Sequence, residues 1–174
     1  MSDDGLAFVD LTDAEFDAYI ASTVPMYAEA LARALGTPPA AALERATKQI
    51  ADLLPNRRTT PDHRFLRVVL EGIALGTLWI GPQREAQPPC LYVYDIVIDE
   101  AARGRGVGTR VMRWVEHEAT RLGLHAVTLS VAAHNEGAVR LYERLGFEPD
   151  KVGPGGMSMI RHLTPAPDGD AAQS

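Results

Sequence analysis

The sequence has a single cysteine, Cys90, no block of Lys or Arg, and no long apolar run. One cysteine cannot form an internal disulfide, and no Cys-x-x-Cys or His-Glu-x-x-His spacing is present to hold a metal ion. No apolar run approaches the roughly 18 residues that a membrane span requires, and residues 1–5 are acidic where a secretory signal would be basic. We therefore expect a cytoplasmic protein with no membrane partner, no disulfide and no metal.

Positive charge is also scarce, because 17 Lys and Arg side chains stand against 23 Asp and Glu, a net charge of −6 at pH 7. This balance repels phosphate backbones, so nucleic acid is not expected as a partner. With 174 residues, 46% of them hydrophobic, the chain suits one ordinary domain with a buried core. We place that domain at residues 1–163 and expect a disordered tail at 164–174, which has breaker residues and no apolar anchor.

The first third of the chain is predicted to be mostly helical. A short apolar run, Leu6–Asp10, suits a strand, and Thr12 with Glu15 has the spacing of a capping box that opens a helix. Pro25 is expected to interrupt or kink this helix, which resumes at 26–35 and stops at Gly36. Thr37 and Pro38 supply a cap and a first-turn proline for a helix that runs to about Leu54.

From Phe65 onward the apolar period changes to two, which indicates strands alternating later with helices. The fold class is α/β (α+β): one mixed, mostly antiparallel central sheet flanked by helices, after a helical N-terminal third. The expected strands are 65–70, 73–80, 90–99, Ala126–Ala132, 147–152 and 157–163, and the expected helices are 106–122 and 135–145.

A glycine-rich loop between the strand at 90–99 and the following helix is the most informative stretch. The helix start leaves backbone N–H groups unpaired at the positive end of the helix dipole, glycines allow a pyrophosphate to approach them, and two arginines add donors. The spacing fits neither a P-loop nor a dinucleotide fingerprint, and a plain tight turn is the alternative reading. The loop reads Arg103, Gly104, Arg105, Gly106, Val107, Gly108, Thr109.

This stretch resembles the GNAT superfamily of acyl-CoA-dependent N-acyltransferases, whose loop has the form Arg/Gln-x-x-Gly-x-Gly/Ala. The resemblance extends from Cys90 to about Leu163. It includes a second pattern, Asn135-x-x-Ala138-x-x-Leu141-Tyr142-Glu143-x-x-Gly146-Phe147.

The resemblance implies roles for individual residues. Backbone groups of Ile96, Val97 and Ile98 are expected to meet the pantetheine arm of acetyl-CoA, and the loop from Arg103 to Thr109 its pyrophosphate. By the same resemblance, Asn135 should hydrogen-bond the arm and Tyr142 should act as general acid toward the leaving thiolate. The alternatives are a helix cap for Asn135 and a core aromatic for Tyr142.

Acyl transfer to an amine needs a neutral amine, although an alkylamine has a pKa near ~10.4, so a proton acceptor is required. Asp95 is the leading candidate, because alternation along the strand places it between Val93 and Val97 on one apolar face. Burial there would raise the pKa of the Asp95 carboxyl, and a structural hydrogen bond to a neighbouring strand is the alternative. Glu71 and His134 are weaker candidates.

The predicted function is transfer of an acetyl group from acetyl-CoA directly to an amine of a small molecule or peptide. A coenzyme-A-binding sensor or scaffold without turnover is the alternative. A bulge or splay in the strand before the loop would free a backbone N–H for the developing oxyanion. No motif identifies the acceptor, and a homodimer is left open.

Overall fold

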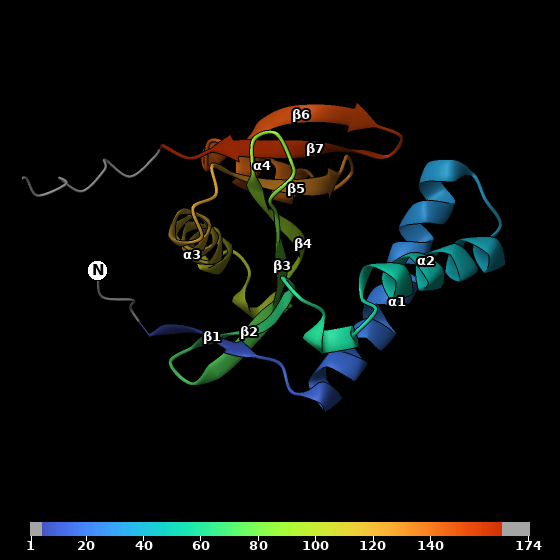
Figure 1. Ribbon diagram of the computed structural model, residues 1–174, viewed down its shortest axis with the longest axis horizontal. Coiled ribbons are helices and arrows are strands. Elements are labelled where there is room, and N and C mark those ends of the chain that lie inside the picture. Colours follow the sequence, from blue (N-terminus) through green and yellow to red (C-terminus); the bar gives the residue numbers. More distant parts are fainter. Residues whose placement is uncertain (1–4, 165–174) are drawn as a thin grey trace, which may run out of the picture.

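The structure, a computed structural model, describes residues 5–164, so nearly all of the tail predicted at 164–174 lies outside the described residues. Seven strands form one sheet in the order β1-β2-β3-β4-β5-β7-β6 (Figure 1). Within the described sheet, β4 and β5 are the one parallel pair. The mixed, mostly antiparallel sheet predicted from the sequence is confirmed. The strands are β1 (Leu6–Asp10), β2 (Arg64–Leu70), β3 (Ile73–Gln83), β4 (Cys90–Ile98), β5 (Ala126–Ala132), β6 (Glu148–Gly153) and β7 (Gly156–His162).

Helices flank the sheet on both sides of β4 (Figure 1). α3 (Val107–Arg121) and α4 (Glu136–Arg144) pack on one face, and α1 (Asp13–Leu35) with α2 (Pro39–Leu53) lies on the other. Short 3-10 turns, η1 (Arg57–Thr59) and η2 (Glu100–Ala102), precede β2 and α3. No helix within residues 5–164 combines the length and the apolar character that crossing a membrane requires.

Two apolar clusters hold these layers together. The larger cluster joins the sheet to α3 and α4, and α3 contributes an apolar stripe of Met112, Val115 and Ala119, all fully buried. The smaller cluster joins α1 to the opposite face of β2 and β3 through Leu11, Phe16, Tyr19, Leu54, Phe65 and Trp79. Neighbouring residues of β2 and β3 therefore enter different clusters, as the period of two requires.

Local capping and turn chemistry explain why most predicted boundaries hold. The Thr12 side chain accepts from the Glu15 N–H and the Glu15 carboxylate accepts from the Thr12 N–H, so the capping box is confirmed. Between β2 and β3, Glu71 and Gly72 have φ of 51° and 81°, as a two-residue hairpin turn with a matching twist requires.

The predicted interruption at Pro25 and the predicted cap at Thr37 are both wrong, whereas a kink at Pro25 stays a prediction. α1 continues through Pro25 without interruption, because it buries Phe16 and Tyr19 before the proline and Ala28 after it. Packing on both sides of Pro25 thus outweighs the one backbone hydrogen bond that proline removes. Thr37 does not cap α2, whose N-cap is Pro38 without a side-chain cap bond.

Candidate active site

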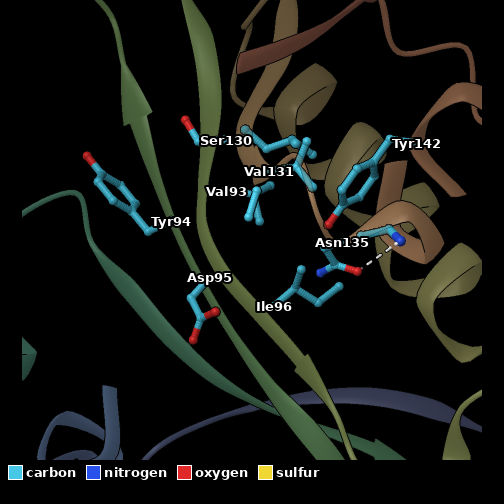
Figure 2. A pocket seen from close by; sticks show the side chains of 11 residues that line it. Val93, Tyr94, Asp95, Ile96, Ser130, Val131, Asn135 and Tyr142 are labelled. Carbon is cyan, nitrogen blue, oxygen red and sulfur yellow. Dashed lines mark hydrogen bonds between the residues drawn. The ribbon is translucent and has the colours of Figure 1, made fainter. Parts of the chain in front are cut away.

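The parallel pair β4–β5 separates partway along its length. The two strands are in register from Cys90 with Ala126 to Val93 with Leu129, although β4 runs on to Ile98 and β5 to Ala132. A pocket of about 140 Å³ opens where they part (Figure 2). Its lining residues come from β4, β5 and α4: Val93, Tyr94, Asp95, Ile96, Leu129, Ser130, Val131, Ala132, Asn135, Ala138 and Tyr142.

A β-bulge on β4 lies at the same level as this separation. Trp79 of β3 is opposite Asp95, but the next β3 residue, Ile80, is opposite Val93, so Tyr94 is an extra residue in β4. The prediction that Val93, Asp95 and Val97 share one face is therefore wrong. Val93 and Ile96 belong to the α3 side of the sheet, whereas Asp95 bonds to α1 on the other side.

Tyr142 enters the pocket from α4 with its hydroxyl directed toward the space between the strands (Figure 2). The residue is 6% exposed, and its ring centroid lies 5.7 Å from that of Phe147. Burial, and secondly the charge of Asp95, raises the pKa of Tyr142 to about 12. The ring is thus a core aromatic while the hydroxyl faces the pocket, so both sequence readings of Tyr142 describe part of it.

Asn135 combines its two predicted roles in a similar way. It is the N-cap of α4, where its Oδ1 accepts from the Ala138 N–H at 3.2 Å (Figure 2). It also lines the pocket. Because the cap uses the amide oxygen, the side-chain NH₂ group remains a donor for a bound molecule.

Asp95 lies across β4 from Tyr142, with its carboxylate directed away from the Tyr142 hydroxyl (Figure 2). The Tyr19 hydroxyl donates to Asp95 Oδ2 at 2.7 Å, so the partner comes from α1 and not from a neighbouring strand. Burial raises the pKa of Asp95, and the bonds from Tyr19 and from the Ile96 N–H partly oppose this shift. The predicted rise of the Asp95 pKa is thus confirmed. The two weaker candidates for the proton acceptor, Glu71 and His134, are not among the described residues that line the pocket.

The glycine loop leads from the end of β4 into α3. Gly104 and Gly106 have φ of 72° and 78°, and an added Cβ at either position would meet open space. Gly106 is the N-cap of α3 and brings no capping side chain, so the first-turn N–H groups of the helix have no intrahelical acceptor. Arg103 Nε donates to the Ile98 carbonyl at 2.9 Å, which ties the loop to β4. Such a helix start suits an anionic group.

Gly108 has a packing role that the loop motif did not indicate. It belongs to the first turn of α3, and an added Cβ would lie 3.2 Å from Leu141 Cδ2 on α4. Glycine here lets the two helices that carry the loop and Tyr142 approach each other closely.

Sequence reasoning missed the part that Tyr19 has in this site. Tyr19 belongs to the smaller cluster, as its place on the inward face of the helix opened by Thr12 requires. Its hydroxyl nevertheless reaches a carboxylate 76 residues away along the chain. Periodicity gives the direction of a side chain but not its partner across the fold.

Comparisons with known proteins agree with this arrangement. The sequence model of the Acetyltransferase (GNAT) family matches residues 27–147, and the chain belongs to this family. YycN of Bacillus subtilis (strain 168), named an uncharacterized N-acetyltransferase, is 32% identical over 139 residues, 79% of this chain and 89% of the relative. YdgE of the same strain, named in the same way, is 29% identical over 144 residues, 79% of this chain and 88% of the relative.

Solved structures show the same fold. The crystal structure of YycN has a TM-score of 0.76 at 29% identity and covers 84% of this chain and 94% of its own. Spermidine N-acetyltransferase from Vibrio cholerae, solved with CoA and spermine, has a TM-score of 0.60 at 15% identity, covering 91% and 95%. The chain is thus an N-acetyltransferase of the GNAT family.

No group of three or more His, Cys, Asp or Glu side chains that could hold a metal occurs in residues 5–164.

Proposed function

We propose that the protein transfers an acetyl group from acetyl-CoA directly to an amine of a small molecule or peptide. The observation that carries this proposal is the placement of Asp95 and Tyr142 on opposite sides of β4, beside the opening between β4 and β5. A proton acceptor on one side and a hydroxyl donor on the other suit a nucleophile and a leaving group that lie on opposite sides of a thioester.

The donor is proposed to lie along the open edge of β4. Beyond Val93 this edge has no β5 partner, so we place the pantetheine arm against the backbone of Ile96, Val97 and Ile98, where the Ile98 carbonyl already accepts from Arg103. The pyrophosphate would be held by the start of α3 and by the loop residues Arg103, Gly104, Arg105, Gly106, Val107, Gly108 and Thr109. The Asn135 amide would donate to the arm.

The proposed reaction needs no nucleophilic side chain. The amine nitrogen attacks the thioester carbon, and its proton passes to the Asp95 carboxylate, whose raised pKa strengthens it as a base. A backbone N–H beside the bulge stabilises the oxyanion. The C–S bond then breaks with its electron pair on sulfur, where the Tyr142 hydroxyl stabilises the thiolate.

The acceptor is proposed to be a cationic amine. The net charge of −6 favours such a molecule, and Asp95 presents a carboxylate at the acceptor side of β4. One protein that shares this fold acts on such an amine by its name, the spermidine N-acetyltransferase from Vibrio cholerae.

Release of free thiol from acetyl-CoA, measured with a panel of polyamines, amino sugars and peptides, tests this function. We expect amine-dependent thiol release and an acetylated amine in the product. The charge reversal Arg105→Glu should weaken CoA binding in calorimetry, whereas Arg144→Glu, an exposed position at the end of α4, should leave it unchanged. CoA binding without thiol release for any amine would instead indicate a sensor or scaffold.

A further inference from the structure

We propose that Tyr19 is a positioning residue that holds the carboxylate of Asp95 in place for the acceptor amine. Helix α1 would then set the geometry of the proton acceptor, although it lies far from β4 in the sequence. This inference rests on the proposed function, because it assigns a role to Tyr19 in that same reaction.

The geometry of the pair is tightly determined. The Tyr19 hydroxyl lies 2.7 Å from Asp95 Oδ2, and Tyr19 is 9% exposed. Its ring packs beside Phe65, with 6.1 Å between ring centroids, and Phe16 makes an edge contact with the same Phe65 ring at 4.8 Å. The start of α1 is fixed by the Thr12 capping box, so the phenol is held by its helix and by the sheet beneath it.

The bond from Tyr19 occupies only one of the two carboxylate oxygens. Oδ2 accepts the hydrogen bond of the phenol, and the Ile96 N–H also donates to the carboxylate. A carboxylate has about four lone-pair sites, so it can still accept a proton from the amine. Without the phenol the carboxyl group could rotate between its two-fold positions, since this torsion is broad in aspartate. A fixed carboxylate retains the orientation toward the amine that general base catalysis requires.

Few of the groups around Asp95 stabilise its negative charge, and Tyr19 is one of them. The surrounding groups are Tyr19 on α1, the adjacent Tyr94, and Trp79 opposite on β3, with the His63 ring tilted against the rings of Trp79 and Tyr94, while Tyr142 on α4 lies across β4. Burial raises the pKa of Tyr94 and lowers that of His63, so both are neutral near pH 7.

Tyr19 itself remains a donor over the whole working range of pH. Burial, followed by the charge of Asp95, raises the pKa of Tyr19 far above its ordinary value. The groups that favour the charged form of Asp95 are the Tyr19 hydroxyl and the Ile96 N–H. Loss of the phenol therefore raises the pKa of Asp95 further. At low pH a larger fraction of the carboxyl is then protonated and unable to accept a proton.

The variant Tyr19→Phe tests the inference through the pH dependence of kcat/KM. We expect the acid limb to move to higher pH, with kcat/KM about tenfold or more below wild type at the foot of the limb, since hydrogen bonds to charged groups are worth that much. On the alkaline plateau the two proteins should agree within about threefold, because free amine is then supplied by the medium. Tyr27→Phe is the matched control: this hydroxyl, on the same helix, donates to Gln49 and not to Asp95.

Two further measurements separate this inference from the proposed function. In an Asp95→Asn background, Tyr19→Phe should cause no additional change of the pH profile. Titration of the Asp95 carboxyl followed by NMR in the free protein should show a higher midpoint in Tyr19→Phe than in Tyr27→Phe. An unmoved acid limb, or equal NMR midpoints, would overturn the role of Tyr19. Failure of the wild-type chain to acetylate any amine would overturn the proposed function, whatever the NMR midpoints are.

Discussion

The variant Tyr142→Phe removes one hydroxyl from the proposed leaving-group side and retains the ring that packs beside Phe147. Tyr142 is 6% exposed, so the phenyl ring keeps its burial in the core. We therefore expect the free energy of unfolding to change by no more than about 1 kcal/mol. The dissociation constant of CoA should also be nearly unchanged, because the expected contacts to the arm and the pyrophosphate come from other residues.

The size of the effect on turnover follows from the pKa of the phenol. Burial raises that pKa to about 12, whereas an ordinary thiol has a pKa of about 8.5. Complete proton transfer from Tyr142 to the thiolate would therefore be uphill by about 5 kcal/mol in the ligand-free environment. The hydroxyl instead stabilises the thiolate by a charge-assisted hydrogen bond, worth about 1.5 to 3 kcal/mol. Turnover should fall about 10- to 100-fold, toward the lower end of the range for general acids.

Single-turnover acetyl transfer with detection of free thiol measures this loss, and calorimetry with CoA provides the control for binding. A donor whose thiol is more acidic should reduce the deficit of Tyr142→Phe, because its thiolate needs less stabilisation. A variant as active as wild type would show that the hydroxyl takes no part in the reaction. Equal losses of CoA affinity and activity would show that it is a contact to the donor.

Three other variants test separate parts of the structure. Asp95→Asn should lose more activity at low pH than at high pH, because an alkaline medium supplies free amine; an equal loss in a pH series would make Asp95 structural. Burial raises the pKa of Asp95 in the folded state, so ionisation of this carboxyl lowers the free energy of unfolding once the pH exceeds its pKa in the unfolded state. Asp95→Asn carries no such charge and should therefore unfold at a higher denaturant concentration than wild type at pH 7. Gly108→Glu should lower both the melting temperature and CoA affinity, since its side chain would enter the contact with Leu141, and normal melting would contradict that packing role. Glu118→Gln should destabilise by about 1 to 3 kcal/mol, because Glu118 is 6% exposed and bonds to Arg64 and Arg121. Hydrogen bonding to Arg121 lowers the pKa of Glu118, so this difference should be present at neutral pH and shrink in denaturation curves as pH falls below about 4.

The features that local chemistry controls could be predicted from the sequence. The capping box at Thr12, the turn at Glu71 and the stripe of α3 each depend on residues within a few positions of one another. The glycine loop and the pattern from Asn135 to Phe147 were sufficient to indicate the family.

The features that were missed depend on pairing across the fold. A bulge or splay in this strand was expected from the chemistry, but nothing in the sequence of β4 places it at Tyr94, because a bulge arises from the register with β3. Without the bulge, simple alternation placed Asp95 on the wrong face and hid its bond to Tyr19. The continuity of α1 through Pro25 likewise depends on packing against other elements, which outweighs local propensity.

The separation of β4 from β5 also has a consequence for the order of events. The two strands share only four residue pairs, so the sheet has a seam, and the amides of β4 beyond it lack the protection of a neighbouring strand on that side. A donor arm bonded along this edge would take the place of the missing strand and slow hydrogen exchange at Ile96 and Ile98, whose N–H groups point away from β3. The side of the acceptor site along β4 would then be complete only after the donor has bound. This favours an ordered mechanism in which acetyl-CoA binds first.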